Sequence, residues 1–420
     1  MIYHIPYDLR ATQQSEGMLR VRVTSDAGPE PIPNARVTIR RSNDPDTIVN
    51  EITTDSSGNT EDIMLEAPPI DYSMQPDSPQ PYTNYTIDIY ADNYEPVRIT
   101  DSELLPDVTS IQPVKMHRIE IPSQTENIVI APHTLFYDYP PKIPEDEIKT
   151  VEETGEIILN RVVIPEFIIV HDGPPNDPGA TNYYVNYTDY IKNVVSSEIY
   201  ATWPESTIYA NTLAIMSFTL NRVYTEWYRN QGYNFTITSS TAYDQKWING
   251  RNIYTNVERI VDSIFNNFLS RPGIRQPIFT IYCDGVNHTC NGMSQWGSKY
   301  LGDEGYAAID ILRNYYGNDI YINSTDYVSG VPSSFPGYTL TQGSRGEPVM
   351  TIQEQLNRIS DNYPLIPKLN VDGILGPKTA EAIRVFQSVF DLPETGTIDA
   401  ATWYKISQIY VGVTRIAEPD

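Results

Sequence analysis

The stretch YIKNVVSSEIYATWP, residues 190–204, ends at a proline immediately before Glu205. Proline suits the first turn of a helix, so a helix is expected to begin here. The following sequence agrees, because apolar residues recur at steps of three and four along one face. These residues are Leu213, Met216, Leu220, Val223 and Trp227. The stretch therefore places Glu198 just before a long helix.

Around this helix, residues 162–325 mix helical and strand patterns. A second helical face is formed by Val257, Val261, Ile264, Phe265 and Phe268. Short apolar runs at 167–170, 235–238 and 277–282 predict strands between the helices. We therefore expect an α+β domain over residues 162–325.

Residues 338–412 predict a small domain of three helices, each with one apolar face. The three faces consist of Val349, Ile352, Leu356 and Ile359; Ala382, Ile383, Phe386 and Phe390; and Trp403, Ile406 and Tyr410. The turn VDGILGP, residues 371–377, separates the first two helices, and Pro377 opens the second. The run GTID, residues 396–399, repeats this turn before the third helix.

Residues 1–118 predict an all-β sandwich. Apolar and polar residues alternate at 19–24, 35–40 and 87–90, as in antiparallel strands with one solvated face. The order of strands and turns loosely resembles the prealbumin-like sandwich of carboxypeptidase regulatory domains. No acid, base or nucleophile set stands out, so we interpret this module as structural or regulatory rather than catalytic.

Residues 119–161 predict a connector that is extended and poorly packed. The segment holds nine acidic residues against Lys142, Lys149 and Arg161, and it includes the run YPPKIP at 139–144. Exposed connectors are sites of proteolysis. Composition alone favours a plain interdomain linker over an activation peptide.

The composition limits the partners. The chain has 420 residues and a formal net charge of −25, which disfavours nucleic acid and anionic membranes as partners. No apolar run is long enough to span a bilayer, and Met1–Gln14 lacks the pattern of a cleavable signal peptide. The 31 tyrosines suit contact with carbohydrate or wall polymer, although each one is at least as well explained by packing.

The predicted three-helix unit resembles the peptidoglycan-binding type 1 domain. The matching segments are LTQGSRGEPV (340–349), IQEQL (352–356), VDGILGPKT (371–379), FQ (386–387) and GTID (396–399). This resemblance implies attachment to cell-wall glycan. We expect a shallow groove at Asp372, Gly373 and Gly376, where backbone groups approach the sugar, although each glycine taken singly is better explained as a turn residue.

The central region resembles the SpoIID/LytB family of sporulation wall enzymes. Two segments carry the resemblance: residues 190–204 and GMSQWGSK (292–299), the latter followed by Gly305-Tyr306 and YYG at 315–317. Glu198 falls on the family's catalytic glutamate. The segment CDGVNHTC (283–290) departs from the family pattern, so a metal site there is doubtful. We expect no metal and no cofactor.

A lytic transglycosylase needs one well-placed carboxyl group, which the resemblance assigns to Glu198. This group protonates the glycosidic oxygen and then takes the proton of the C6 hydroxyl, so that a 1,6-anhydro ring closes without water. An apolar setting would keep the acid protonated. Ile199, Tyr200, Trp203 and Tyr190 are expected to provide it. The alternative role for Glu198 is a helix cap, and Glu205 is interpreted as structural.

Seven residues are candidates for substrate contact. The hydroxyl-rich block TSSTAYDQ (238–245) matches a family block and can bond sugar hydroxyl and acetamido groups. The candidates are Tyr200, Trp203, Ser240, Tyr243, Gln245, Gln295 and Trp296. Trp296 is equally well explained as a core residue.

The two cysteines, Cys283 and Cys290, leave alternatives open. Their spacing allows a disulfide if the loop turns back on itself. With His288 they could instead supply three metal ligands, but no fourth is evident nearby. This incomplete ligand set favours a disulfide or a buried pair of thiols.

The four-part arrangement resembles the SleC family of clostridial spore cortex-lytic enzymes. It implies an inactive precursor in which residues 1–118 are a regulatory pro-domain and which a subtilisin-like germination protease cuts within 119–161. It also implies that the mature enzyme degrades cortex peptidoglycan as a lytic transglycosylase. The resemblance thereby reverses the preference for a plain linker. The candidate cleavage segments are 123–125 and 147–154. The expected partner is cortex peptidoglycan, and the expected location is the spore cortex or the coat–cortex boundary. The alternatives are a non-catalytic wall-binding protein or amidase activator, and an N-acetylmuramoyl-L-alanine amidase.

Overall fold

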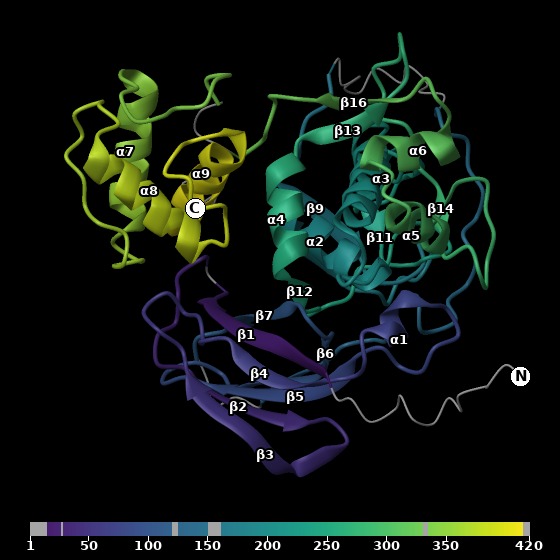
Figure 1. Ribbon diagram of the computed structural model, residues 1–420, viewed down its shortest axis with the longest axis horizontal. Coiled ribbons are helices and arrows are strands. Elements are labelled where there is room, and N and C mark those ends of the chain that lie inside the picture. The colour runs from purple at the N-terminus through teal and green to yellow at the C-terminus, as the bar shows by residue number, and fades with distance from the viewer. Residues whose placement is uncertain (1–14, 27, 120–124, 150–160, 331–334, 415–420) are drawn as a thin grey trace, which may run out of the picture.

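A computed structural model describes residues 15–26, 28–119, 125–149, 161–330 and 335–414. Figure 1 shows three parts: a sheet-rich N-terminal region, a central region of helices and short strands, and three C-terminal helices. The N-terminal region lies beneath the other two parts. The chain is therefore multidomain, with sheet at one end and a helical unit at the other.

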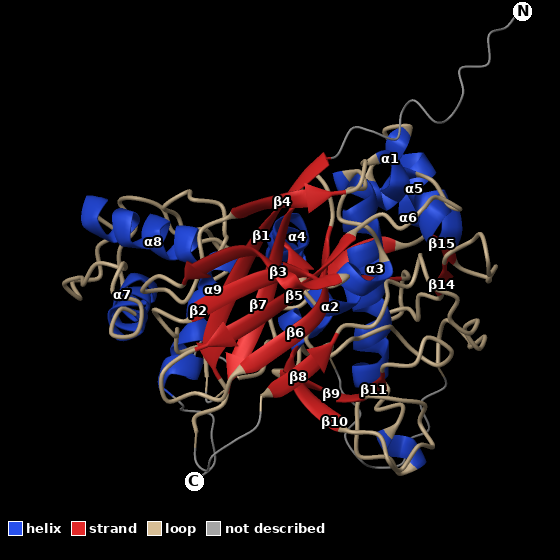
Figure 2. Cartoon of the chain, turned by 90° about the horizontal axis from the view of Figure 1, so that it is seen from below, coloured by secondary structure: helices blue, strands red, loops and turns tan. Residues whose placement is uncertain are grey.

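The N-terminal region contains two sheets, with strand orders β12-β7-β1-β4 and β3-β2-β5-β6-β8. Its elements are β1 (Ser15–Ser25), β2 (Arg36–Arg41), β3 (Asp44–Thr53), β4 (Ile63–Ala67), α1 (Asp71–Met74), β5 (Thr83–Tyr90), β6 (Val97–Leu104) and β7 (Thr109–Met116). The predicted alternation holds in β1, where Leu19, Val21 and Val23 are buried with residues of the other sheet in one hydrophobic cluster. Figure 2 shows these strands at the centre, with helices on either side.

Two strands of these sheets come from beyond residue 118. Strand β8 (Glu126–Val129) pairs in parallel with β6, and β12 (Ile253–Tyr254) pairs antiparallel with β7. The N-terminal sheets are thus completed by the segment predicted as a connector and by the central region.

The central region is built around α3 (Glu205–Tyr224), in which Leu213, Met216 and Leu220 are buried as the periodicity predicts. Its other elements are β9 (Phe167–His171), β10 (Asn182–Asn186), α2 (Tyr187–Glu198), η2 (Arg229–Gln231), β11 (Ile237–Thr238), α4 (Thr255–Ile264), β13 (Asn267–Ser270), β14 (Tyr282–Cys283), β15 (Met293–Ser294), α5 (Gln295–Asp303), α6 (Ala308–Tyr316) and β16 (Tyr321–Ser324). Phe268 lies in β13 rather than on the second predicted helix, which ends at Ile264.

The C-terminal region forms the three expected helices: α7 (Glu347–Ile359), α8 (Pro377–Val389) and α9 (Ala400–Thr414). A buried glutamine holds each of the two similar turns. Gln353 Oε1 accepts a hydrogen bond from Gly373 N at 2.8 Å, and Gln387 Oε1 accepts one from Gly396 N at 2.8 Å. The repeated turn seen in the sequence is therefore a repeated backbone–glutamine arrangement.

Residues 130–149, here called the strap, differ from the predicted loose connector. The strap runs along the central region, where Ile143 N donates to Ala242 O at 2.7 Å and Lys149 N donates to Gln276 Oε1 at 2.8 Å. His133 and Lys149 are buried. The acids of the strap find cations there: Glu145 pairs with Arg222 and Lys149. The candidate cleavage segments 123–125 and 147–154 lie partly outside the described residues.

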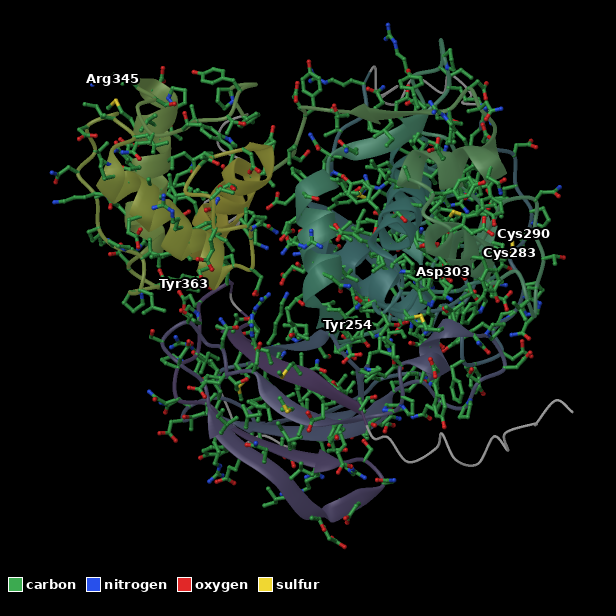
Figure 3. All side chains as sticks on the ribbon, in the orientation of Figure 1. Tyr254, Cys283, Cys290, Asp303, Arg345 and Tyr363 are labelled. Carbon is green, nitrogen blue, oxygen red and sulfur yellow. A yellow bond between two sulfur atoms is a disulfide. The ribbon has the colours of Figure 1, made fainter. Side chains whose placement is uncertain are left out.

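Buried polar contacts join the three parts. Arg251 of the central region pairs with Glu103 of β6 at 2.5 Å, with both side chains almost inaccessible to water. Arg22 of β1 pairs with Glu258 of α4 and with Asp391 of the C-terminal region. Figure 3 shows Tyr254 and Tyr363 at the two junctions with the N-terminal sheets, and Arg345 at the far end of the C-terminal region.

Candidate active site

Glu198 is the last residue of α2, which ends because Ile199 adopts an extended conformation. Its residue is 4% exposed, and three donors hold its carboxylate. Oε1 accepts hydrogen bonds from Lys246 N at 2.8 Å and from the Tyr282 hydroxyl at 3.3 Å, and Oε2 accepts one from Gln295 Nε2 at 3.1 Å. Glu198 therefore has a fixed orientation and does not cap the helix that follows.

The donor Gln295 is held by the motif at 292–299. Gln295 is the first residue of α5, and Ser294 caps this helix by accepting a hydrogen bond from Gly297 N at 2.8 Å. Gln295 Nε2 also donates to the backbone oxygen of Glu198 at 3.1 Å. The motif thus links the start of α5 to the end of α2.

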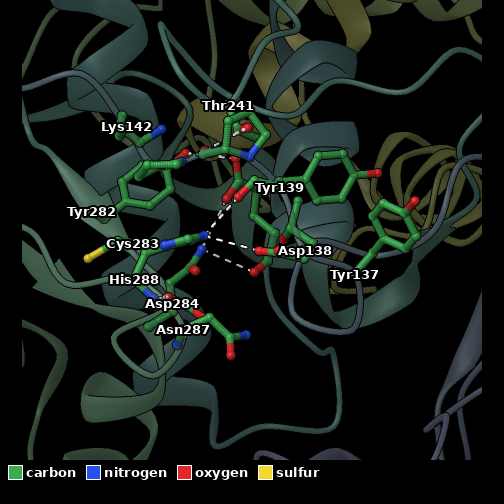
Figure 4. A pocket seen from close by; sticks show the side chains of 15 residues that line it. Tyr137, Asp138, Tyr139, Lys142, Thr241, Tyr282, Cys283, Asp284, Asn287 and His288 are labelled. Carbon is green, nitrogen blue, oxygen red and sulfur yellow. Dashed lines mark hydrogen bonds and ion pairs between the residues drawn. The ribbon is translucent and has the colours of Figure 1, made fainter.

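A pocket opens beside Glu198, and the strap forms much of its lining (Figure 4). The strap contributes Thr134, Tyr137, Asp138, Tyr139, Pro140, Pro141 and Lys142. The central region contributes Glu198, Thr241, Tyr282, Cys283, Asp284, Asn287, His288 and Gln295. Glu198 therefore shares its pocket with the strap, which comes before the central region in the chain.

Lys142 of the strap brings a cation to the lining of this pocket. Its ammonium donates to Asp244 O and lies 4.6 Å from the centre of the Tyr282 ring. Burial lowers the pKa of Lys142, and the nearby carboxylate of Glu198 opposes that effect. The strap therefore places a partly desolvated cation beside Glu198.

The predicted aromatic candidates lie away from the pocket lining. Tyr200, Trp203 and Trp296 are 2%, 3% and 3% exposed, and the rings of Trp203 and Trp296 are 4.9 Å apart. Trp203 Nε1 donates to Ser73 O of the N-terminal region at 2.8 Å. The three rings form one aromatic cluster, and none lines the pocket.

The hydroxyl-rich block divides between interior and surface. Gln245 is fully buried, and its Oε1 accepts a hydrogen bond from the Tyr190 hydroxyl at 3.1 Å. Ser240 and Tyr243 are half-buried but do not line the pocket, whereas their neighbour Thr241 does. The Tyr190 hydroxyl therefore contacts Gln245. Burial raises the pKa of Tyr190, and the carboxylates of Asp244 and Glu198 add to this effect, so Tyr190 also lies near Glu198 as expected.

Sequence reasoning missed three groups at this site. Asp244 is fully buried and accepts hydrogen bonds from Thr238, Tyr228 and Arg222, so it fixes the block that carries Thr241. Tyr282 and the backbone of Lys246 touch Glu198 directly. Tyr282 stood at the end of a predicted strand, and Asp244 stood inside the family block. A backbone donor leaves no signal in side-chain type.

Glu205, the competing carboxylate, lies at the start of α3. Its side chain is 64% exposed and pairs with Arg259 on α4. An acid at this position also interacts favourably with the helix dipole. Its position is that of a surface structural residue.

Cys283 and Cys290 form a disulfide that closes the loop between β14 and β15, with Cα atoms 6.1 Å apart. Their sulfur atoms are thus bonded to each other. Within the part of the chain that the structure describes, no group of three or more His, Cys, Asp or Glu side chains is arranged to hold a metal ion. His288 instead faces the strap.

The predicted wall-binding residues lie at the first glutamine-held turn. Asp372 accepts hydrogen bonds from Gln353 Nε2 and Ile374 N, both at 2.9 Å, and these bonds lower its pKa, with Gln353 the larger cause. Gly373 has a φ of +68°, and a Cβ there would lie 2.8 Å from Met350 Cγ. A Cβ on Gly376 would meet open space. Asp372 and Gly373 therefore shape the turn, and Gly376 leaves its surface clear.

Two family models match parts of the chain. Residues 180–267 match the family model of the Stage II sporulation protein, SpoIID. Residues 345–406 match the putative peptidoglycan binding domain. The two matches support a sporulation-associated, peptidoglycan-active enzyme with a wall-binding domain. They also support a cell-wall location outside the cytoplasm. Among the described helices, none is long and apolar enough to cross a membrane.

Other comparisons are weaker. No curated protein matched the chain. The minor pilin GBS52 of Streptococcus agalactiae is 13% identical over 26% of this chain and 48% of the pilin, with a TM-score of 0.19. Chlorocatechol 1,2-dioxygenase of Pseudomonas putida is 16% identical over 28% of this chain and 60% of the dioxygenase, with a TM-score of 0.16. Each likeness covers less than two thirds of the other protein, and neither contributes to the assignment.

Proposed function

We propose that this chain is the precursor of a spore cortex-lytic enzyme that cleaves glycan strands as a lytic transglycosylase. The observation that carries the proposal is the carboxyl group of Glu198, which is buried, held by three donors and opens onto a pocket. The bond cleaved joins N-acetylmuramic acid to N-acetylglucosamine.

One carboxyl group performs both proton transfers in this proposal. Glu198 gives its proton to the leaving glycosidic oxygen and then takes the proton of the C6 hydroxyl, which attacks C1 and closes the 1,6-anhydro ring. Lys246 N and Tyr282 hold one oxygen and Gln295 holds the other, so the carboxyl keeps its orientation through both steps.

The strap supports the precursor part of the proposal. Its residues 134 and 137–142 occupy the side of the pocket where a glycan strand would approach Glu198. The strap follows β8, which is paired with β6 of the N-terminal sheets, so the blocking segment and the N-terminal region form one structural unit. The proposed activation is proteolysis within 119–161 by a subtilisin-like germination protease. A cut after residue 149 would separate the strap from the central region, turn this tethered inhibitor into a separable one and lower its effective concentration by orders of magnitude.

The products test the chemistry. The full chain, carrying an inserted cleavage site for a specific protease within 150–160, is cut and incubated with isolated cortex, and the released muropeptides are analysed by mass spectrometry. We expect 1,6-anhydromuramic ends, together with loss of release in Glu198→Gln and near-normal release in the control Glu205→Gln. Reducing ends or free peptides would instead indicate a hydrolase or an amidase. Lysis that persists in Glu198→Gln would overturn the catalytic assignment, and no lysis by any cut chain would favour a wall-binding protein or amidase activator.

A further inference from the structure

Two of the strap's contacts in the pocket are made by amide carbonyl groups. His288 Nε2 lies 2.9 Å from the backbone oxygen of Tyr139, and Thr241 Oγ1 donates to the backbone oxygen of Pro140 at 3.3 Å. Both protein groups line the pocket that contains Glu198. Two successive carbonyl oxygens of the strap are therefore held by two side chains of the central region, on the face that a substrate would occupy (Figure 4).

The loop that carries His288 is rigidly built. The disulfide between Cys283 and Cys290 closes it, and the Asp284 carboxylate accepts hydrogen bonds from Asn287 N and His288 N, both at 2.8 Å. Gly285 has a φ of +80°, and a Cβ there would lie 1.9 Å from Ser294 Oγ, which leaves no room for a side chain. His288 is thus presented from a loop with its backbone fixed at both ends.

The chemistry of these contacts identifies a ligand. An amide carbonyl bonded to a side-chain donor is the group that an N-acetylated sugar also offers, because its acetamido substituent is itself an amide. The ring of His288 also lies 3.2 Å from Asp138 Oδ1, which is another group of the strap. When the strap leaves, the imidazole and the Thr241 hydroxyl have no partner from it and face the pocket.

We propose that His288 and Thr241 form a subsite for the acetamido carbonyl of an N-acetylated amino sugar, and that the strap occupies this subsite with its own amide carbonyls. The inference rests on the proposed function, because it assumes that glycan enters the pocket beside Glu198. It adds a basis for selectivity: an N-acetylated strand binds, and a de-N-acetylated strand loses the hydrogen bond to His288.

The test is a ratio of affinities. The full chain with Glu198→Gln is cut within 150–160 as above, and its binding by calorimetry is compared for two probes. The probes are a cell-wall tetrasaccharide of alternating N-acetylglucosamine and N-acetylmuramic acid, and the same tetrasaccharide after chemical de-N-acetylation. Within each variant the ratio of the two dissociation constants cancels any residual competition from the strap, and the charge of the free amine is the same in all variants.

We expect about a tenfold preference for the N-acetylated probe, reduced to about twofold or less when His288→Ala is added, and partly restored by His288→Gln, whose amide can donate. The matched control is Val286→Ala, an exposed side chain on the same loop that does not line the pocket; it should keep the preference. An unchanged ratio in His288→Ala, or no preference in the parent, would overturn the inference while leaving the proposed function intact. A parent that binds neither probe would overturn the proposed function itself.

Discussion

Gln295 was predicted from the sequence as a substrate contact, and in the structure its amide bonds Glu198 twice, through the backbone oxygen and the carboxylate. Both contacts orient the carboxyl group rather than a ligand. A positioning residue of this kind affects the rate of the chemical step more than the binding of substrate.

We therefore expect Gln295→Ala in the cut chain to lower kcat by about 10- to 100-fold with little change in KM, because small misplacements of a reacting group are costly. Steady-state kinetics on soluble glycan strands provide the measurement. A rise in KM with kcat unchanged would return Gln295 to the role of a substrate contact. The exposed Asp303→Ala on the same helix is the control and should leave both constants unchanged.

At the scale of elements, the strap depends on a few buried contacts. The ammonium of Lys142 lies over the Tyr282 ring and donates to Asp244 O, and Glu145 binds Arg222. We expect Lys142→Ala to raise the activity of the uncut chain several-fold, while proteolysis raises it further. Dye release from decoated spores measures this. Ile143→Ala is the control, because that side chain is exposed and its backbone bond to Ala242 remains. Full activity of the unmodified, uncut chain would contradict the precursor role.

His133 makes the stability of the folded chain, and with it the packing of the strap, sensitive to acid. It is fully buried, its ring stacks 4.4 Å from Tyr200, and its Nδ1 accepts a hydrogen bond from Leu135 N, so the neutral form is required. Burial, with Arg251 as a second cause, lowers the pKa of His133 well below 6.5. Because the unfolded chain then binds the proton more readily, this stabilisation is complete above about pH 6.5 and is lost as the pH falls below it.

We expect the free energy of unfolding to fall with a slope of up to about 1.4 kcal/mol per pH unit below pH 6.5, and His133→Gln to remove that component of the slope. Denaturant unfolding of the uncut chain at a series of pH values measures it. Equal slopes in the two proteins would contradict the assignment. His117→Gln serves as the control, because His117 is exposed.

The sequence predicted the regular elements well and the strap poorly, for a physical reason. Periodicity identifies α7 and α8 because each buries one apolar face against its own neighbours. It also identifies α3 and α9, although α3 is buried nearly all round. The acids of the strap looked like those of a solvated linker, because composition does not distinguish an acid in water from one paired with a distant arginine such as Arg222. For the same reason Glu198 was found through a motif, whereas Asp244 and the backbone donor of Lys246 required the fold.

For the whole molecule, the pocket beside Glu198 and the turn that is proposed to bind the wall lie in different places. The turn at Asp372 and Gly376 belongs to the same end of the C-terminal region as Arg345, since Arg345 and Ile374 form a β-bridge. Figure 3 places Arg345 far from the N-terminal sheets, which contact this region near Tyr363. The strap therefore lines the pocket beside Glu198, whereas the N-terminal sheets contact the C-terminal region at Tyr363, away from the turn.

We expect the uncut chain to bind insoluble peptidoglycan already, with an affinity within about twofold of the cut chain, because the turn is open in both. Co-sedimentation with purified cortex measures this, and Arg345→Ala combined with Asp372→Ala should weaken both forms alike. Binding that develops only after cleavage would contradict the separation of the two functions.

The pairing of β7 with β12 bears on how long the central region would stay folded after it separates from the N-terminal region. Ile111 and Ile253 are neighbours in one sheet although they lie far apart in the chain, and Arg251 next to this strand is neutralised by Glu103 of the N-terminal region. The central region therefore shares a sheet and a buried ion pair with the N-terminal region. In the proposed activation, departure of the N-terminal region would leave the central region with a buried cation and a strand edge that have lost these partners, so we expect its persistence to depend on a slow rate of unfolding rather than on equilibrium. We therefore expect activation to run in one direction and to give a metastable enzyme, suited to a single round of use and not to being stored again.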